Sequence, residues 1–187
     1  MASIFTIFTI LLLIISSSFI PLITPHQFSR QLSSFGMIPK ITNLQFYFYD
    51  KFSGPKPTAQ RIVTGPTSNT FFGTVVMIDD ALLETQSKNS RVIGRAQGLY
   101  AGEDQTTLAF LMVVNYVFTA GKYNGSTLSV LGRNPALQTV REMPILGGTG
   151  LFRYAQGFAL ASTKWFNNAG DAIVEYNVTV FHFENDD

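Results

Sequence analysis

The chain has 187 residues and a formal net charge of +1, and 13% of its residues are charged. This length suits a single domain, and the lack of a basic stripe argues against nucleic-acid binding. Cysteine is absent, so zinc–thiolate sites, cysteine nucleophiles and redox dithiols are excluded. Of the two histidines, His26 and His182, we expect His182 at a strand end or the surface rather than in a metal site. The 17 phenylalanines favour a β-rich core or an aromatic-lined pocket.

The chain begins with an uncharged apolar run over residues 4–23. The run is long enough for a membrane helix, but Ser16–Ser18 and Pro21 interrupt it. We therefore predict a secretory signal peptide over residues 1–24, cleaved between Ser17 and Gln27. An uncleaved signal anchor is the less favoured alternative. The signal peptide predicts a protein secreted to the extracellular space, without a stable membrane anchor.

Two glycosylation sequons suit a secreted chain. They are Asn124-Gly125-Ser126 and Asn177-Val178-Thr179. The sequence therefore predicts glycosylation at Asn124 and Asn177.

Beyond the leader, residues 25–42 are polar and turn-prone and are expected to form a flexible arm, and residues 43–187 form the folded domain. Within this domain, short apolar runs alternate with Gly, Pro, Asn and Ser, and no long segment has a helical stripe. The pattern predicts strands near 43–50, 60–64, 70–79, 91–100, 107–118, 126–132, 138–146, 151–163 and 171–183. Many short strands at short spacing indicate a β-sandwich or a β-barrel.

One glycine-rich run, Gly147-Gly148-Thr149-Gly150, raises the question of a phosphate-binding loop. Such a loop needs a helix directly after it, so that backbone N–H groups and the helix dipole meet the anion. The residues that follow, LFRYAQGF, alternate as a strand does, and no Lys-Ser/Thr pair is present. The run therefore predicts a hairpin corner.

Strand alternation places four polar side chains on otherwise apolar faces: Asp50, Tyr100, Asn134 and Arg141. Phe48 shares its face with Asp50, and Leu137 and Thr139 are expected to share theirs with Arg141. A buried charge is costly unless it is paired, and pairing Asp50 with Arg141 across the barrel floor would keep both charged. The alternative is that each polar residue simply reaches solvent at a strand end. Together the four favour a pocket with polar groups in an apolar wall.

Several segments carry a family resemblance. They are FYFYD at 46–50, GRAQGLY at 94–100 and REMPILGGTGLFRYAQG at 141–157. With them, the chain resembles the plant dirigent proteins over residues 43–183. Two further segments, GKYNGSTLSVLGRN at 121–134 and VREMPILGGTGLF at 140–152, are similar to the branch that contains the pterocarpan synthases.

The resemblance implies an all-β fold, an eight-stranded antiparallel β-barrel with one pocket. It also implies a homo-oligomer (usually a trimer, with a dimer as the alternative) and secretion to the apoplast. It implies phenolic small molecules as ligands and no cofactor or metal.

The resemblance offers three functions. The favoured one is guidance: an external oxidase (a laccase or a peroxidase) makes phenoxy radicals, for example from coniferyl alcohol. The barrel, without oxidative activity of its own, orients them so that they couple stereoselectively to lignans. The alternative is a pterocarpan synthase-like dehydratase that closes an isoflavanol. The second alternative is a defence protein that binds phenolics or the cell wall without catalysis.

The resemblance also assigns roles to residues of this chain. It implies Asp50 as a general acid or base or as a stabiliser of a quinone methide, Arg141 as its ion partner or a phenolate clamp, and Tyr100 as a hydrogen-bond donor. It places Asn134 and Phe48 among the substrate-binding residues. The chain departs from lignan-forming members in having Tyr49 for a histidine, Asn134 for an aspartate, Gly102 for a tyrosine and Leu151 for an aspartate. These departures argue against pinoresinol as the product.

Overall fold

The computed structural model describes residues 37–66 and 69–185. Nine strands are present in this part of the chain, together with two short 3₁₀ turns. They are β1 (Met37–Asp50), β2 (Ala59–Val63), β3 (Val75–Leu83), β4 (Val92–Gly102), β5 (Ala109–Phe118), η1 (Gly121–Tyr123), β6 (Thr127–Pro135), β7 (Arg141–Thr149), η2 (Gly150–Phe152), β8 (Gln156–Phe166) and β9 (Ala172–Asn185). No helix within the described ranges has the length and apolar character that a membrane crossing needs. The predicted signal peptide and most of the predicted arm lie outside the described residues.

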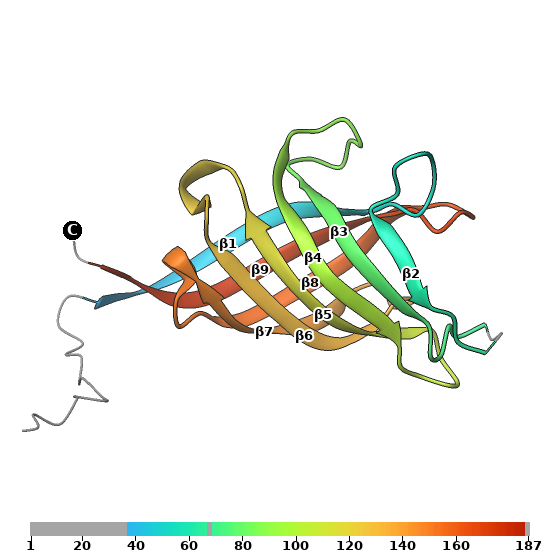
Figure 1. Cartoon of the computed structure of the whole chain (residues 1–187). Coiled ribbons are helices and arrows are strands. Elements are labelled where there is room, and N and C mark those ends of the chain that lie inside the picture. The colour runs from blue at the N-terminus through green and yellow to red at the C-terminus, as the bar shows by residue number, and fades with distance from the viewer. Residues whose placement is uncertain (1–36, 67–68, 186–187) are drawn as a thin grey trace, which may run out of the picture. The chain divides into compact units, whose positions relative to one another are not determined.

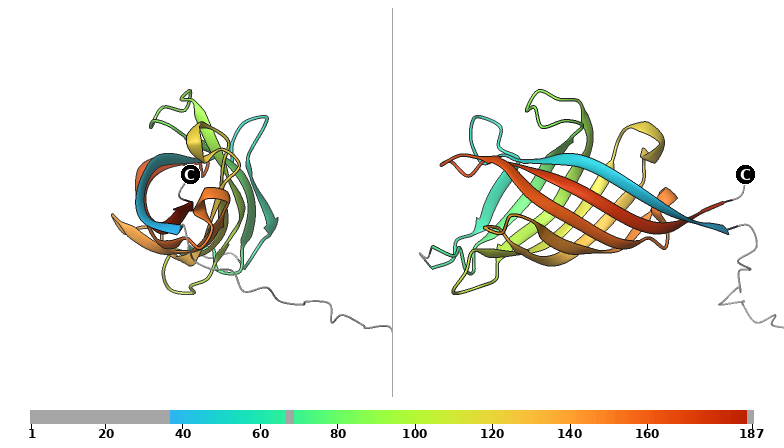
Figure 2. Two further views of the ribbon diagram at one scale, coloured as in Figure 1. Left: turned by 90° about the vertical axis from the view of Figure 1, so that its left-hand side faces the viewer. Right: turned by 180° about the vertical axis from the view of Figure 1, so that it is seen from behind.

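Eight of the strands close into an antiparallel barrel (Figures 1 and 2). The hydrogen-bonded order runs β1-β9-β8-β7-β6-β5-β4-β3, and β3 returns to β1 with Phe48 opposite Leu82. β2 pairs with β3 as a ninth strand, where Ala59 lies opposite Ile78. The predicted eight-stranded antiparallel barrel is therefore confirmed.

Several strand boundaries differ from the sequence prediction, and three of them have a clear physical reason. β1 begins at Met37, within the stretch expected to be an arm, because its first residues pair with the end of β9 from Met37 opposite Asn185 onward. β3 runs to Leu83, although the prediction ended it at the acidic residues, because Asp79 faces solvent and Asp80 faces the interior. β8 begins at Gln156 because η2 occupies the start of the predicted strand.

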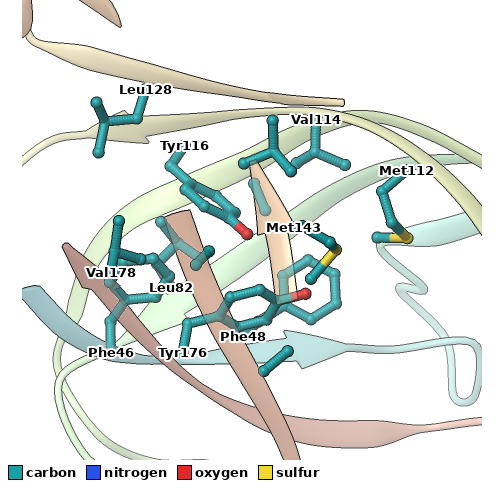
Figure 3. Packing of buried hydrophobic residues seen from close by; sticks show 14 of the residues in the cluster. Phe46, Phe48, Leu82, Met112, Val114, Tyr116, Leu128, Met143, Tyr176 and Val178 are labelled. Atoms are coloured by element: carbon teal, nitrogen blue, oxygen red, sulfur yellow. The ribbon is translucent and has the colours of Figure 1, made fainter. Parts of the chain in front are cut away.

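Aromatic rings fill the barrel interior next to its cavity, and Tyr176 borders both parts. Phe46, Tyr116 and Tyr176 point inward from β1, β5 and β9 (Figure 3). The ring centroid of Phe46 lies 5.0 Å from that of Tyr116 and 5.8 Å from that of Tyr176. Ala96 of β4 lies opposite Tyr116 and therefore leaves room for its ring. Alternating small and large residues thus close this part of the interior.

His182 belongs to this closed part. It is fully buried, at 0% exposure, and its Nε2 lies 2.9 Å from the Thr42 hydroxyl. His182 does lie near the end of β9, but the expectation of a surface position was wrong, because the Phe152 ring of η2 lies 5.3 Å from the imidazole ring and Thr42 of β1 contacts it.

The glycine-rich run forms the corner between β7 and β8. Gly150 has a φ of +61°, which favours glycine, and a Cβ on Gly148 would lie 2.7 Å from Phe152. A three-residue 3₁₀ turn follows and leads into β8, with no helix to bind an anion. The hairpin-corner prediction is therefore confirmed.

Candidate functional site

A cavity of about 480 Å³ opens at the end of the barrel where β1 and β6 end and β7 and β9 begin. Its wall includes all five pocket residues expected from the sequence: Phe48, Asp50, Tyr100, Asn134 and Arg141. They come from four strands, β1, β4, β6 and β7, and each reaches the cavity from the inner face of its strand. The structure therefore brings the five together, while their roles remain predictions.

Asp50 and Tyr100 form the first polar pair of the cavity. The Tyr100 hydroxyl of β4 donates to Oδ2 of Asp50 at 2.8 Å. Burial, together with the negative charge of nearby Asp80, raises the pKa of Asp50 to about 8, although the Tyr100 hydrogen bond acts in the opposite direction. Burial also raises the pKa of Tyr100, so its hydroxyl stays protonated and donates. The raised pKa favours the protonated form of Asp50, which is the form that can act as a general acid.

Asp80 is a functional candidate that the sequence analysis missed. Its side chain is 0% exposed and accepts a hydrogen bond from the Thr58 hydroxyl. Burial raises the pKa of Asp80 to about 7, against the lowering effect of Thr58. The signal was present in the sequence, since Asp80 continues the apolar face of Val76 and Ile78. The predicted strand ended at residue 79, however, just before Asp80.

Arg141 and Asn134 form the second polar pair. Nε of Arg141 donates to Oδ1 of Asn134 at 3.1 Å, and Nη1 donates to the Gln138 carbonyl at 3.4 Å. The Arg141 residue is only 3% exposed, and burial lowers its pKa, but the guanidinium stays charged at neutral pH. No ion pair joins Arg141 to Asp50 in the described ranges, so the expected charge pair was wrong. The reason is that each group finds a neutral partner: Asp50 accepts from Tyr100 two strands away on β4, and Arg141 donates to Asn134 on the adjacent β6.

The residues before β7 also differ from expectation. Leu137 was expected on the inner face with Arg141, but it is 82% exposed. It lies in the turn between β6 and β7, since Gln138 N–H donates to the Pro135 carbonyl. Arg141 is therefore the first inward residue of its strand and stands at the cavity mouth.

Aromatic side chains make up much of the remaining wall. Phe48 of β1, Phe110 of β5 and Tyr176 of β9 line the cavity. The rings of Tyr100 and Phe110 meet edge to face at 5.2 Å, and those of Phe48 and Tyr176 at 6.0 Å. Such walls suit a planar aromatic ligand, because rings pack on rings in stacked or edge-on geometry.

Asp171 ties together two loops at the cavity mouth. It accepts hydrogen bonds from the backbone N–H groups of Phe52 and Ser53, both at 2.8 Å, and from Asn167 Nδ2 at 3.1 Å. Phe52 and Asn167 in turn line the cavity. Asp171 thus fixes part of the entrance without lining it.

The two sequons lie away from the cavity. Asn124 follows η1 and Asn177 lies on the outer face of β9, and both are exposed. The placement leaves both side chains accessible, while glycosylation stays a prediction. No group of three or more His, Cys, Asp or Glu residues in the described part of the chain gathers in a way that suits a metal ion.

Comparison with known proteins gives matches across this barrel. The family model for the dirigent-like proteins matches residues 41–181. Dirigent protein 23 of Arabidopsis thaliana is 47% identical over 161 residues, which cover 84% of this chain and 86% of the relative. Pterocarpan synthase 1 of Glycyrrhiza echinata is 44% identical over 151 residues, 77% of this chain and 79% of the relative.

A solved structure agrees with these matches. The pterocarpan synthase dirigent protein GePTS1 superposes with a TM-score of 0.76 at 41% identity, over 84% of this chain and 90% of that one. The family match, the relatives and the shared barrel together establish that the chain belongs to the dirigent family.

Proposed function

We propose that this barrel binds a planar phenolic alcohol of the isoflavanol class and catalyses the loss of its hydroxyl group as water, with ring closure to a pterocarpan. The observation that carries the proposal is the buried Asp50 carboxyl in an aromatic cavity, where burial raises its pKa and favours the protonated form. A protonated acid has a direct task in dehydration and none in radical coupling. The similarity to pterocarpan synthases adds support.

The chemistry balances without an oxidant. Asp50 gives its proton to the leaving hydroxyl, the C–O bond breaks, and water departs. A phenol on the same ring system loses its proton as the ring becomes a quinone methide. A second phenol oxygen of the substrate then adds to the exposed carbon and forms the new C–O bond, and the protons released return to Asp50 and the first phenol. The net change is the loss of one water molecule.

The other polar groups have separate tasks in this scheme. The Tyr100 hydroxyl holds Asp50 in place through Oδ2. Arg141 carries a buried positive charge beside the neutral Asn134, so it can stabilise the negative charge that develops on the phenol oxygen. Phe48 and Phe110 pack against the aromatic rings and orient the attacking oxygen.

Stereoselective radical coupling is the second candidate. The aromatic walls and the 480 Å³ cavity favour it, because guidance needs orientation and no catalytic group. It requires an external laccase or peroxidase to supply the radicals. The neutral Asn134 and Gly102, at positions where lignan-forming members carry an aspartate and a tyrosine, weigh against it.

We also propose that the protein is secreted and self-associates. The predicted signal peptide and the exposed sequons support secretion. A row of apolar residues supports self-association, since Met77, Leu99, Val113 and Leu131 lie directly opposite one another on the outer face of four consecutive strands. A second copy of the chain would remove this row from water.

Two incubations test the function. In the first, the purified protein meets an isoflavanol without any oxidase; in the second, it meets coniferyl alcohol and a laccase. Chiral chromatography measures both products. Pterocarpan in the first incubation supports the dehydratase, and an enantiomeric excess in the second alone supports guidance. A racemic second product and no first product would leave binding without catalysis.

A further inference from the structure

A second buried carboxyl lies beside Asp50 at the seam that closes the barrel. β1 meets β3 through Tyr49 opposite Ala81, so the next pair along the seam is Asp50 and Asp80. Both side chains lie on the inner faces of their strands, and the residues are 8% and 0% exposed. Two ionised carboxylates at such a place would repel each other strongly, because little water screens them.

Each of the two carboxyl groups has one oxygen with a hydrogen-bond partner and one without. Asp50 accepts from Tyr100 through Oδ2, and Asp80 accepts from Thr58 through Oδ1. The other oxygen of each group, Oδ1 of Asp50 and Oδ2 of Asp80, is buried and has no partner. A single proton on one of these two oxygens removes the repulsion and supplies the missing donor.

We propose that Asp50 and Asp80 hold one proton between them, and that Asp80 is the positioning residue that keeps this proton on Asp50. The proposal rests on the proposed function in one respect, since it explains how the acid of the dehydration stays loaded. Asp80 does not line the cavity, so it acts through Asp50 and not on the substrate.

The hydrogen-bond donors around the two carboxyl groups decide which of them holds the shared proton. The Thr58 hydroxyl and the Lys51 backbone N–H both hydrogen-bond Asp80 and favour its ionised form. Asp50 receives one hydrogen bond, from Tyr100, and burial opposes its ionised form. The negative charge of the pair therefore settles on Asp80, and the proton settles on Asp50, next to the cavity.

The other charged groups around the pair modify this balance. Asp171 lies near enough to Asp50 to disfavour a second negative charge there. On the β3 side, Arg95 favours an ionised Asp80 and Asp79 disfavours it. The cations of the cavity, Arg61 and Arg141, form no ion pair with either carboxyl in the described ranges. Asp80 is thus the carboxyl that faces Asp50 across the seam.

Titration of Asp50 tests the proposal without any substrate. Protein labelled with ¹³C at the aspartate carboxyls is titrated by NMR, and the Asp50 signal is assigned by its loss in D50N. We expect D80N to lower the pKa of Asp50 by about one unit or more, because it removes the repelling charge. The matched control is D79N, one residue away on the outer face, where the carboxylate pairs with Arg95 at 2.8 Å; it removes a charge that disfavours ionised Asp80, so the pKa of Asp50 should not fall. An unchanged Asp50 titration in D80N overturns the proposal.

A second variant covers the case in which D80N does not fold. Thr58→Val keeps the shape of the side chain but removes its hydrogen bond to Asp80. The proton then moves toward Asp80, so the pKa of Asp50 should fall in T58V as well. An unchanged or higher pKa of Asp50 in T58V contradicts the proposed direction of sharing.

The pH profile of dehydration separates positioning from mere structural support. In D80N the loss of activity at high pH should begin about one unit lower than in the wild type, while the rate at low pH stays within about twofold. A purely structural role would lower the rate at every pH and leave the position of the limb unchanged, which would overturn the proposal. If the NMR shift appears but no isoflavanol is dehydrated, the shared proton stands and the proposed function fails.

Discussion

Arg141 donates its Nε–H to the amide oxygen of Asn134 at 3.1 Å, so the buried guanidinium of the cavity meets a neutral group. Its second oxygen partner, the Gln138 carbonyl, is also neutral. A buried cation without a counter-ion stays available for a negative charge that develops on the ligand. This arrangement leads to the first prediction.

Replacing Asn134 by aspartate should weaken catalysis. In N134D a carboxylate would neutralise Arg141, so kcat for isoflavanol dehydration should fall about tenfold or more, as for loss of one charge-stabilising donor. Steady-state rates at neutral pH measure the effect. The control is N115D on the outer face of β5, where the new carboxylate can still accept from Ser129 as the amide does at 2.7 Å. An N134D protein as active as N115D would contradict this role of Arg141.

Removing the Tyr100 hydroxyl should make Asp50 a weaker acid. The hydrogen bond from Tyr100 lowers the pKa of Asp50, so Y100F should raise that pKa and shift the high-pH limb of activity upward. The rate should fall about 10- to 100-fold, and unfolding should become easier by about 1 kcal/mol. Tyr47→Phe is the matched control, since it loses a similar bond to Glu175, at 3.2 Å, on the outer face. A downward shift of the limb in Y100F would contradict the assignment.

The pH dependence of folding should reveal the buried carboxyl. The folded pKa of Asp50 lies at about 8, above the ordinary value of 3.8, so the folded protein binds the proton more tightly than the unfolded chain. Its contribution to stability is therefore greatest below pH 3.8 and is lost as the pH rises toward 8. The free energy of unfolding of D50N minus that of the wild type should increase across this window, as denaturant titrations at several pH values would record. A flat difference would mean that Asp50 titrates normally.

Many of the strands were predictable because they alternate cleanly, whereas the closed eight-stranded barrel was expected from the family resemblance. On β1, Phe46, Phe48 and Asp50 point inward as the period of two requires. The alternation also singled out Tyr100 and Arg141 as polar residues on apolar faces. It needed no knowledge of which strands pair.

The missing parts depend on pairing that a local pattern does not contain. The sequence pattern did not identify Asp80 as a site residue, because two adjacent acids resemble the end of a strand. Only the pairing of β1 with β3 places Asp80 beside Asp50. The expected ion pair between Asp50 and Arg141 failed for the same reason, since closure of the barrel brings Tyr100 of β4 to Asp50 and the β6–β7 pairing brings Asn134 to Arg141. His182 is buried because the Phe152 ring of η2 packs against it, a contact that the local pattern of β9 does not contain.

Removing the Asp171 carboxylate, which holds two loops together at the cavity mouth, should impair substrate binding more than the chemical step. Burial by itself would raise the pKa of Asp171, but hydrogen bonds from Ser53, Asn167 and the Phe52 backbone outweigh it and lower the pKa. D171N weakens these bonds, so the protein should lose about 1–3 kcal/mol of stability and KM should rise with a smaller change in kcat.

The pH dependence of D171N gives a further check on Asp171. The Asp171 carboxylate of the wild type stabilises the fold above its ordinary pKa of 3.8. This stabilisation is lost as the pH falls through the lower pKa that Asp171 has in the folded protein. D171N and the wild type should therefore converge in stability at low pH. D79N, which also removes a carboxylate of lowered pKa but on the outer face, should leave KM unchanged. An unchanged KM in D171N would contradict the role of Asp171 at the entrance.

The most direct test of the account is the dehydration of an isoflavanol by wild-type protein and by D50N, under anaerobic conditions and without any oxidase. The account predicts pterocarpan and one equivalent of water from the wild type, and a rate at least about 100-fold lower from a D50N protein that unfolds at no lower temperature. Equal rates for the two proteins, or no product from the wild type, would contradict it.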